Sequence, residues 1–118
     1  MINMFIEKLQ EKINEYYTCY YEESPSNATF PFLVIPTLNL TPLYDGYQGI
    51  FDIEIFINEL SDQNVEFIMD NLRDKLEGYS YRDDNLGFHI GFENQIIVKS
   101  NEQDLSIRRM SFSARIFK

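Results

Sequence analysis

The sequence predicts an α+β domain in which two helices pack on a mainly antiparallel sheet of about six strands, in the order α-β-β-β-α-β-β-β. The first observation is strict alternation within residues 48–58, where Phe51, Ile53, Ile55 and Ile57 share one face of a strand. The β-branched and aromatic content of this segment suits a half-buried strand at the centre of the sheet. Two other segments repeat apolar residues at helical spacing, and short turns between the expected strands favour antiparallel pairing.

The whole chain, residues 1–118, is expected to form one domain. Hydrophobic residues make up 44% of it, with ten Phe and eight Tyr, which is enough for one core without disulfide bonds. The single cysteine, Cys19, has no partner for an internal disulfide, and this suits a reducing compartment. No apolar run approaches the roughly 18 residues of a membrane span, and the charged N-terminal segment is unlike a signal peptide.

Two amphipathic helices are expected. The first covers residues 3–16, where apolar side chains recur every three or four positions. The second begins at Ser61 or Asp62, either of which would cap it, and runs to about Glu77. Gly78 then stands where a left-handed C-terminal cap belongs.

The remaining segments are expected to be extended, over residues 18–23, 30–43, 48–58, 87–92, 96–99 and 105–117. Prolines interrupt the second of these segments, which is therefore an edge or interrupted strand. A turn at Asp45-Gly46 predicts a hairpin into the central strand, residues 79–86 a polar loop, and Glu93-Asn94 another turn. Apolar residues change parity along the last strand, which predicts a β-bulge near Arg108 and Arg109.

The formal net charge of −9 argues against tight, nonspecific binding of nucleic acid, which needs cationic groups to displace counterions. Four acidic residues recur at every fourth position of the expected second helix and form one acidic stripe: Asp62, Glu66, Asp70 and Asp74. This stripe is either an ordinary solvated face or a surface kept negative for a partner or to repel DNA.

Residues that could carry chemistry lack the partners that chemistry requires. Asp52 and Glu54 point the same way but have no visible third ligand, and a solvated role is expected for them. His89 is expected to be structural or at the surface, because no nucleophile motif accompanies it. Cys19 is expected to be a small core residue, and the segment from Asp83 lacks the ligands of a calcium loop. The sequence thus predicts no catalytic residue, no metal and no cofactor.

Several local patterns resemble the tail-terminator, or tail-completion, proteins of long-tailed phages and prophages. The segment Tyr20-Tyr21-Glu22-Glu23-Ser24-Pro25, followed by Phe30-Pro31-Phe32-Leu33-Val34, resembles the early hairpin of that family. The Asp45-Gly46 turn and the strand Ile53–Ile57, followed by a helix, are similar to its next segment. The ending from Arg109 to Phe117 is similar to its last strand.

The resemblance implies a structural subunit of a ring, a hexamer on the tail, that caps the tail tube, ends its polymerisation and joins it to the head connector. The implied partners are further copies of the chain, the tail tube protein and the head–tail connector protein, while DNA passes without tight binding. The implied location is the virion tail, and the cytoplasm of the host bacterium during assembly. The family has no catalytic residues.

Two surfaces are candidates for these contacts. Tyrosine is favoured at interfaces because it joins an apolar body to a polar tip, although half-buried tyrosines at the edge of a core explain the high tyrosine count equally well. The candidate interface residues are Tyr20, Tyr21, Phe30, Tyr44, Tyr47, Arg108, Arg109 and Arg115. The acidic stripe is the candidate lumen face.

Two alternatives stay open. One is a different phage neck or adaptor protein. The other is a small-ligand-binding module or enzyme whose pocket is lined by tyrosines and by Asp52 and Glu54. The mass of the protein in solution separates these, since a concentration-dependent ring favours assembly, and a strict monomer with a deep pocket favours a ligand.

Overall fold

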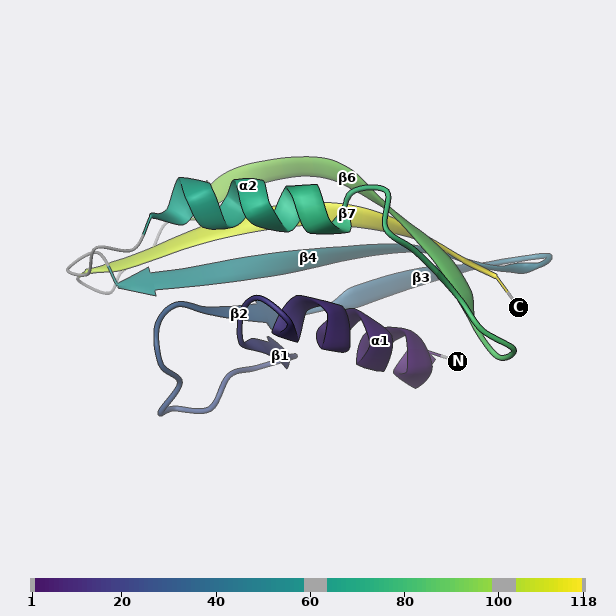
Figure 1. Ribbon diagram of the computed structural model, residues 1–118, viewed down its shortest axis with the longest axis horizontal. Helices are drawn as coiled ribbons and strands as arrows, with labels where there is room; N and C mark the ends of the chain where they lie inside the picture. Colours follow the sequence, from purple (N-terminus) through teal and green to yellow (C-terminus); the bar gives the residue numbers. More distant parts are fainter. Residues whose placement is uncertain (1, 59–63, 99–103, 118) are drawn as a thin grey trace.

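The computed structural model describes residues 2–58, 64–98 and 104–117 (Figure 1). Two helices and seven strands confirm the α+β class, with one strand more than expected. In chain order the elements are α1 (Ile2–Asn14), β1 (Cys19–Tyr21), β2 (Phe32–Ile35), β3 (Leu38–Leu43), β4 (Gly46–Asn58), α2 (Val65–Leu76), β5 (Ser80–Arg82), β6 (Gly87–Val98) and β7 (Leu105–Phe117).

The sheet is built around β4 and β7. These strands pair antiparallel along their full length, from Gly46 opposite Phe117 to Asn58 opposite Leu105. The strand order is β1-β2-β4-β7-β6-β5, and β3 pairs with the same edge of β4 that β2 uses further along. The expected central strand is therefore confirmed.

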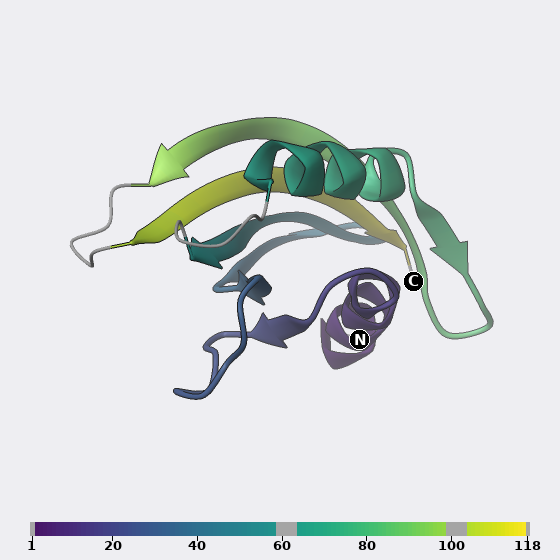
Figure 2. The same cartoon turned by 60° about the vertical axis from the view of Figure 1, so that its left-hand side comes forward.

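The sheet is mixed, because β1 and β2 run parallel while the other pairs are antiparallel. Residues 22–31 carry the chain back from the end of β1 to the start of β2, so the two strands enter the sheet in the same direction (Figure 2). The expected extended segment 30–43 is indeed interrupted: it divides at Pro36 into β2 and β3. Proline cannot donate a ladder hydrogen bond, and a break at this position lets both pieces use the β4 edge.

Three predictions for the C-terminal half were wrong. Residues 80–82, expected within a loop, form β5 and pair with β6. The turn expected at Glu93-Asn94 is absent from this described segment, where β6 continues and Glu93 is an extra residue between the pairs of Phe92 and Asn94 with β7. The β-bulge therefore lies in β6, and the β4–β7 register is unbroken past Arg108 and Arg109. A bulge absorbs one residue without ending the ladder, which is why a turn was not needed.

The helices are shorter than expected. α1 ends at Asn14, two residues before the predicted end. α2 begins at Val65, where the Asn64 side chain caps it by accepting a hydrogen bond from the Phe67 amide at 3.1 Å. The predicted caps, Ser61 and Asp62, lie outside the described residues. Gly78 has φ +80°, which confirms a left-handed residue after α2.

Both helices pack on one face of the sheet. Their buried side chains, among them Phe5 of α1 and Leu72 of α2, join a single core with Phe51, Ile53 and the other inward residues of β4. Phe5 ties α1 to two strands, because its ring makes edge contacts with Phe51 and with Phe88 at centroid distances of 6.1 and 5.0 Å. We call the side of the sheet on which the helices pack the helix-covered face. The opposite side carries Ile50, which is 53% exposed, and we call it the open face.

Candidate assembly surface

The open face carries a ladder of paired charges. Because side chains alternate along a strand, Asp52 and Glu54 lie on this face opposite Ser111 and Arg109 of β7. Arg109 donates a hydrogen bond to the Glu54 carboxylate at 2.8 Å, and Ser111 donates one to Asp52 at 2.6 Å. The Arg109 Nε lies 3.9 Å from the second Asp52 oxygen. The bond to Glu54 raises the pKa of Arg109, so the guanidinium stays charged and offsets one of the two carboxylate charges.

An aromatic patch lies at one end of the open face. Phe32 of β2 and Phe56 of β4 are cross-strand neighbours whose rings stack at 4.9 Å, and Tyr20 and Phe30 contact Phe32 at 6.0 and 5.3 Å. The three phenylalanine rings form part of a hollow of about 320 Å³, which we call the aromatic hollow. Its lining residues are Ser24, Pro25, Ser26, Ala28, Phe30, Phe32, Phe56 and Leu105.

The β3–β4 hairpin forms the opposite end of the sheet. Leu43 pairs with Gly46, so Tyr44 and Asp45 make the tip, and the Tyr44 side chain is fully exposed. A Cβ at position 46 would lie 1.9 Å from the Ile116 carbonyl oxygen, so the hairpin requires glycine there. Arg115 of β7 pairs with the Asp45 carboxylate, which holds the pKa of Asp45 below its usual value. The tip is thus tied to the body of the sheet.

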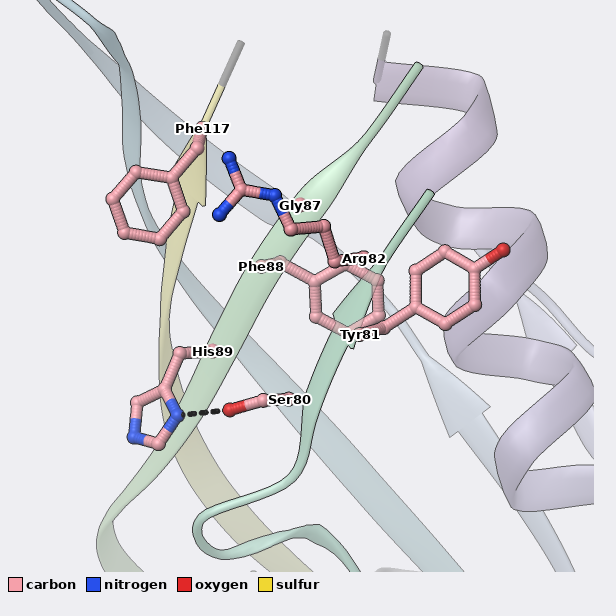
Figure 3. A pocket seen from close by; sticks show the side chains of 7 residues that line it. All are labelled: Ser80, Tyr81, Arg82, Gly87, Phe88, His89 and Phe117. Atoms are coloured by element: carbon pink, nitrogen blue, oxygen red, sulfur yellow. Dashed lines mark hydrogen bonds between the residues drawn. The ribbon is translucent and has the colours of Figure 1, made fainter. Parts of the chain in front are cut away.

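A second hollow, of about 290 Å³, lies along β5 and β6 and brings together a serine and a histidine (Figure 3). The Ser80 hydroxyl and His89 Nδ1 are 2.6 Å apart. Nucleophilic catalysis needs a third group to orient the imidazole, and no described residue bonds its other nitrogen. Both side chains are exposed, so the pair serves best as a polar link between the two strands. This pair could not be predicted from sequence, because Ser80 fell within an expected loop.

The other candidates for chemistry have structural surroundings. Asp83 accepts hydrogen bonds from the Asn85 and Leu86 amides at 2.7 and 2.8 Å, which makes it a turn residue rather than a metal ligand. Cys19 is buried, and desolvation raises its pKa to about 12, so it is a core residue as expected. Among the described residues, no group of three or more His, Cys, Asp or Glu side chains could hold a metal ion. No described helix is long and apolar enough to cross a membrane.

The structure describes three of the four residues of the acidic stripe. Glu66, Asp70 and Asp74 are exposed on α2, and Asp62 lies outside the described residues. Arg73 on the same helix interacts with Glu77 at 3.6 Å and lies over the Phe92 ring at 4.3 Å. The described part of the stripe therefore remains a negative surface on the outer side of α2.

The candidate interface residues do not gather on one surface. Tyr20 and Phe30 belong to the aromatic patch, and Tyr44 to the hairpin tip. Tyr21 and Tyr47 are half-buried and pack against the core, as expected for tyrosines at a core edge. Arg109 and Arg115 lie on the open face and pair with carboxylates of this chain, while Arg108 bonds the Ser106 hydroxyl at 2.7 Å.

Comparison with known proteins gives one useful likeness. Neither a protein-family model nor a curated protein sequence matches the chain. Among solved structures, the chain is similar to one from the virion of a native gene transfer agent particle, with a TM-score of 0.68 and 11% sequence identity. The match covers 84% of this chain and 78% of that one. The two chains therefore share a fold.

Proposed function

We propose that this chain is a structural protein of a phage-type virion, and more specifically a tail terminator that forms a ring on the end of the tail tube. The observation that carries the proposal is the fold shared with a chain of a virion particle over most of both lengths. Fold alone does not define function, so the surfaces must agree with it. They do: an aromatic patch, a projecting hairpin and an open sheet face suit contacts with other proteins.

The charge distribution suits a channel through which DNA passes without being bound. Glu66, Asp70 and Asp74 present carboxylates to solvent along one helix. Facing a lumen, such a stripe would repel the DNA backbone, whereas a basic lumen would bind it in a salt-dependent way. The proposed partners are further copies of the chain in a hexamer, the tail tube protein and the head–tail connector.

A non-catalytic role is part of this proposal. The Ser80–His89 pair has no orienting acid among the described residues, and the carboxylates of Asp52 and Glu54 are committed to Ser111 and Arg109. The hollows are shallow and small, near the lower end of the roughly 300–1,000 Å³ typical of ligand pockets.

The test is a tube-polymerisation assay with a phage tail tube protein. Added in small molar amounts, this protein should stop elongation and shorten the tubes, as measured by electron microscopy, with density at one tube end. A bovine serum albumin control at equal concentration should not change tube length. Unchanged tube length together with binding to the connector would favour the neck or adaptor alternative, and binding to neither would overturn a role in the tail.

The lumen position is tested by Asp70→Lys with Asp74→Lys in assembling particles. Normal assembly with impaired DNA delivery supports the lumen. Failed assembly places the stripe at an interface, and no effect on either makes it an ordinary solvated face. Glu7→Lys with Glu11→Lys on α1 is the matched control for the change in net charge.

A further inference from the structure

We propose that the β3–β4 hairpin tip of one copy docks in the aromatic hollow of the next copy, and that this head-to-tail contact builds the ring. The inference rests on the proposed function, which supplies the ring. What the inference adds is the identity of the two surfaces that meet between neighbouring copies. The occupant of the aromatic hollow is therefore a second copy of this chain, and the inserted side chain is Tyr44.

The two surfaces lie at opposite ends of one strand. The tip adjoins Gly46, the first residue of β4, whereas Phe56 of the hollow stands near the end of the same strand. Ten residues of β-strand span about 33 Å, so a copy cannot fill its own hollow. Figure 1 shows the hairpin projecting at one end of the molecule, away from the end where β4 finishes. A contact between different surfaces of two identical copies generates a ring when its rotation closes.

The tip and the hollow match chemically. Tyr44 is fully exposed and Leu43 beside it is 41% exposed, so the tyrosine ring stands in water. The hollow offers the rings of Phe30, Phe32 and Phe56 as an apolar floor, with serine hydroxyls at Ser24 and Ser26 for a phenol to meet. Tyrosine suits a site that is apolar at its base and polar at its rim.

Charge also favours this pairing. Each copy carries a net charge of −9, so two copies repel unless they meet through surfaces without unpaired carboxylates. None of the residues lining the hollow is charged. At the tip, the carboxylate of Asp45 is already neutralised by Arg115. The contact therefore brings the uncharged lining of the hollow against a tip whose carboxylate is paired.

The expected strength of the contact agrees with assembly on a tube end. A tyrosine buries about 150–250 Å², far below the roughly 800 Å² per partner of a stable interface. Free copies should therefore be monomeric at low concentration. Several such contacts, combined with binding to the tube, gain from effective concentration and hold a ring together.

The contact is tested by cross-linking two introduced cysteines, Leu43→Cys at the tip, which keeps Tyr44 in place, and Ala28→Cys in the hollow, with a short bismaleimide. The native Cys19 is 5% exposed and its burial raises its pKa to about 12, so it should not react. We expect a ladder of covalent oligomers at high protein concentration and a ring-sized limit at tube ends. The control pair, Leu43→Cys with Asp74→Cys on α2, should give no ladder.

The functional arm replaces Tyr44 by Ala or by Phe. Tyr44→Ala should lose most capping of tubes, and Tyr44→Phe should retain it, while both unfold at the same urea concentration as the wild type because the side chain is exposed. Capping by Tyr44→Ala equal to that of the wild type, or no ladder from the pair of cysteines at positions 43 and 28 in either condition, overturns the inference and leaves the proposed function standing. If the wild type fails to cap tubes, the proposed function fails, and the ladder at high concentration still decides the contact.

Discussion

The pair formed by Glu54 and Arg109 should be worth measurably more than an ordinary surface ion pair. Arg109 and Glu54 meet at 2.8 Å with side chains 36% and 16% exposed. The same chain provides a comparison in Arg73 and Glu77, which meet at 3.6 Å with side chains 51% and 48% exposed. Hydrogen bonds to charged groups contribute about 1.5–3 kcal/mol when well covered, and exposed helix pairs about 0.3–0.5 kcal/mol.

Partial exposure places the first pair between these limits, so we expect a coupling free energy of about 1 kcal/mol for Arg109 with Glu54 and about 0.4 kcal/mol for Arg73 with Glu77. Each is measured by a double-mutant cycle, with Arg109→Met and Glu54→Gln in one and Arg73→Met and Glu77→Gln in the other, using urea unfolding at pH 7. Arg109→Met alone should cost more than the coupling, because it leaves the neighbouring carboxylates of Asp52 and Glu54 without the cation that they share. Equal couplings in the two cycles would refute the view that the open face carries an organised charge ladder.

Three further outcomes follow from burial and charge. Leu72→Ala should lower the free energy of unfolding by about 2–5 kcal/mol in urea, because Leu72 is 1% exposed, and Asp74→Ala on the same helix by less than about 0.5 kcal/mol. Cys19 should resist Ellman's reagent at pH 8 in the folded protein and react at once in denaturant, and rapid labelling of the native thiol would contradict its burial. The pKa of Asp45 should lie below the usual value of about 3.9 in an NMR titration and should return toward that value in Arg115→Gln. Because the folded pKa is lowered, the pair stabilises the fold at pH values above the pKa of the unfolded carboxyl. That contribution is lost as the pH falls through the folded pKa.

The centre of the fold could be predicted because its signals are local. Alternation in residues 48–58 fixed both the strand and its buried face, and the apolar stripe of α2 is buried as its spacing requires. The glycine at position 46 predicted the hairpin, because few residues other than glycine adopt the backbone conformation found there. Each of these features depends on side chains a few residues apart in sequence.

The parts that failed depend on partners far away in the chain. Glu93 reads equally well as a turn or as a bulge, and pairing with β7 decides between them. The parity change along β7 signalled something real, but not a bulge: Leu105 lines the aromatic hollow and Ile107 pairs with Phe56 on the open face. The pattern changed because that end of the open face becomes apolar. The pattern is better interpreted as an apolar patch on the open face. That patch includes part of the aromatic hollow, which is the proposed docking site.

The distribution of charge explains how so acidic a chain could assemble. At physiological salt the Debye length is about 8 Å, so repulsion between copies depends on the charges close to the contact rather than on the total. On the open face, Arg109 offsets one of the two negative charges of Asp52 and Glu54, and at the hairpin tip Arg115 offsets the charge of Asp45. The exposed carboxylates of the acidic stripe stand instead on α2, on the other side of the sheet. The fold thus separates a surface on which copies can meet from one that repels, and a ring built through the first would present the second to whatever passes beside it.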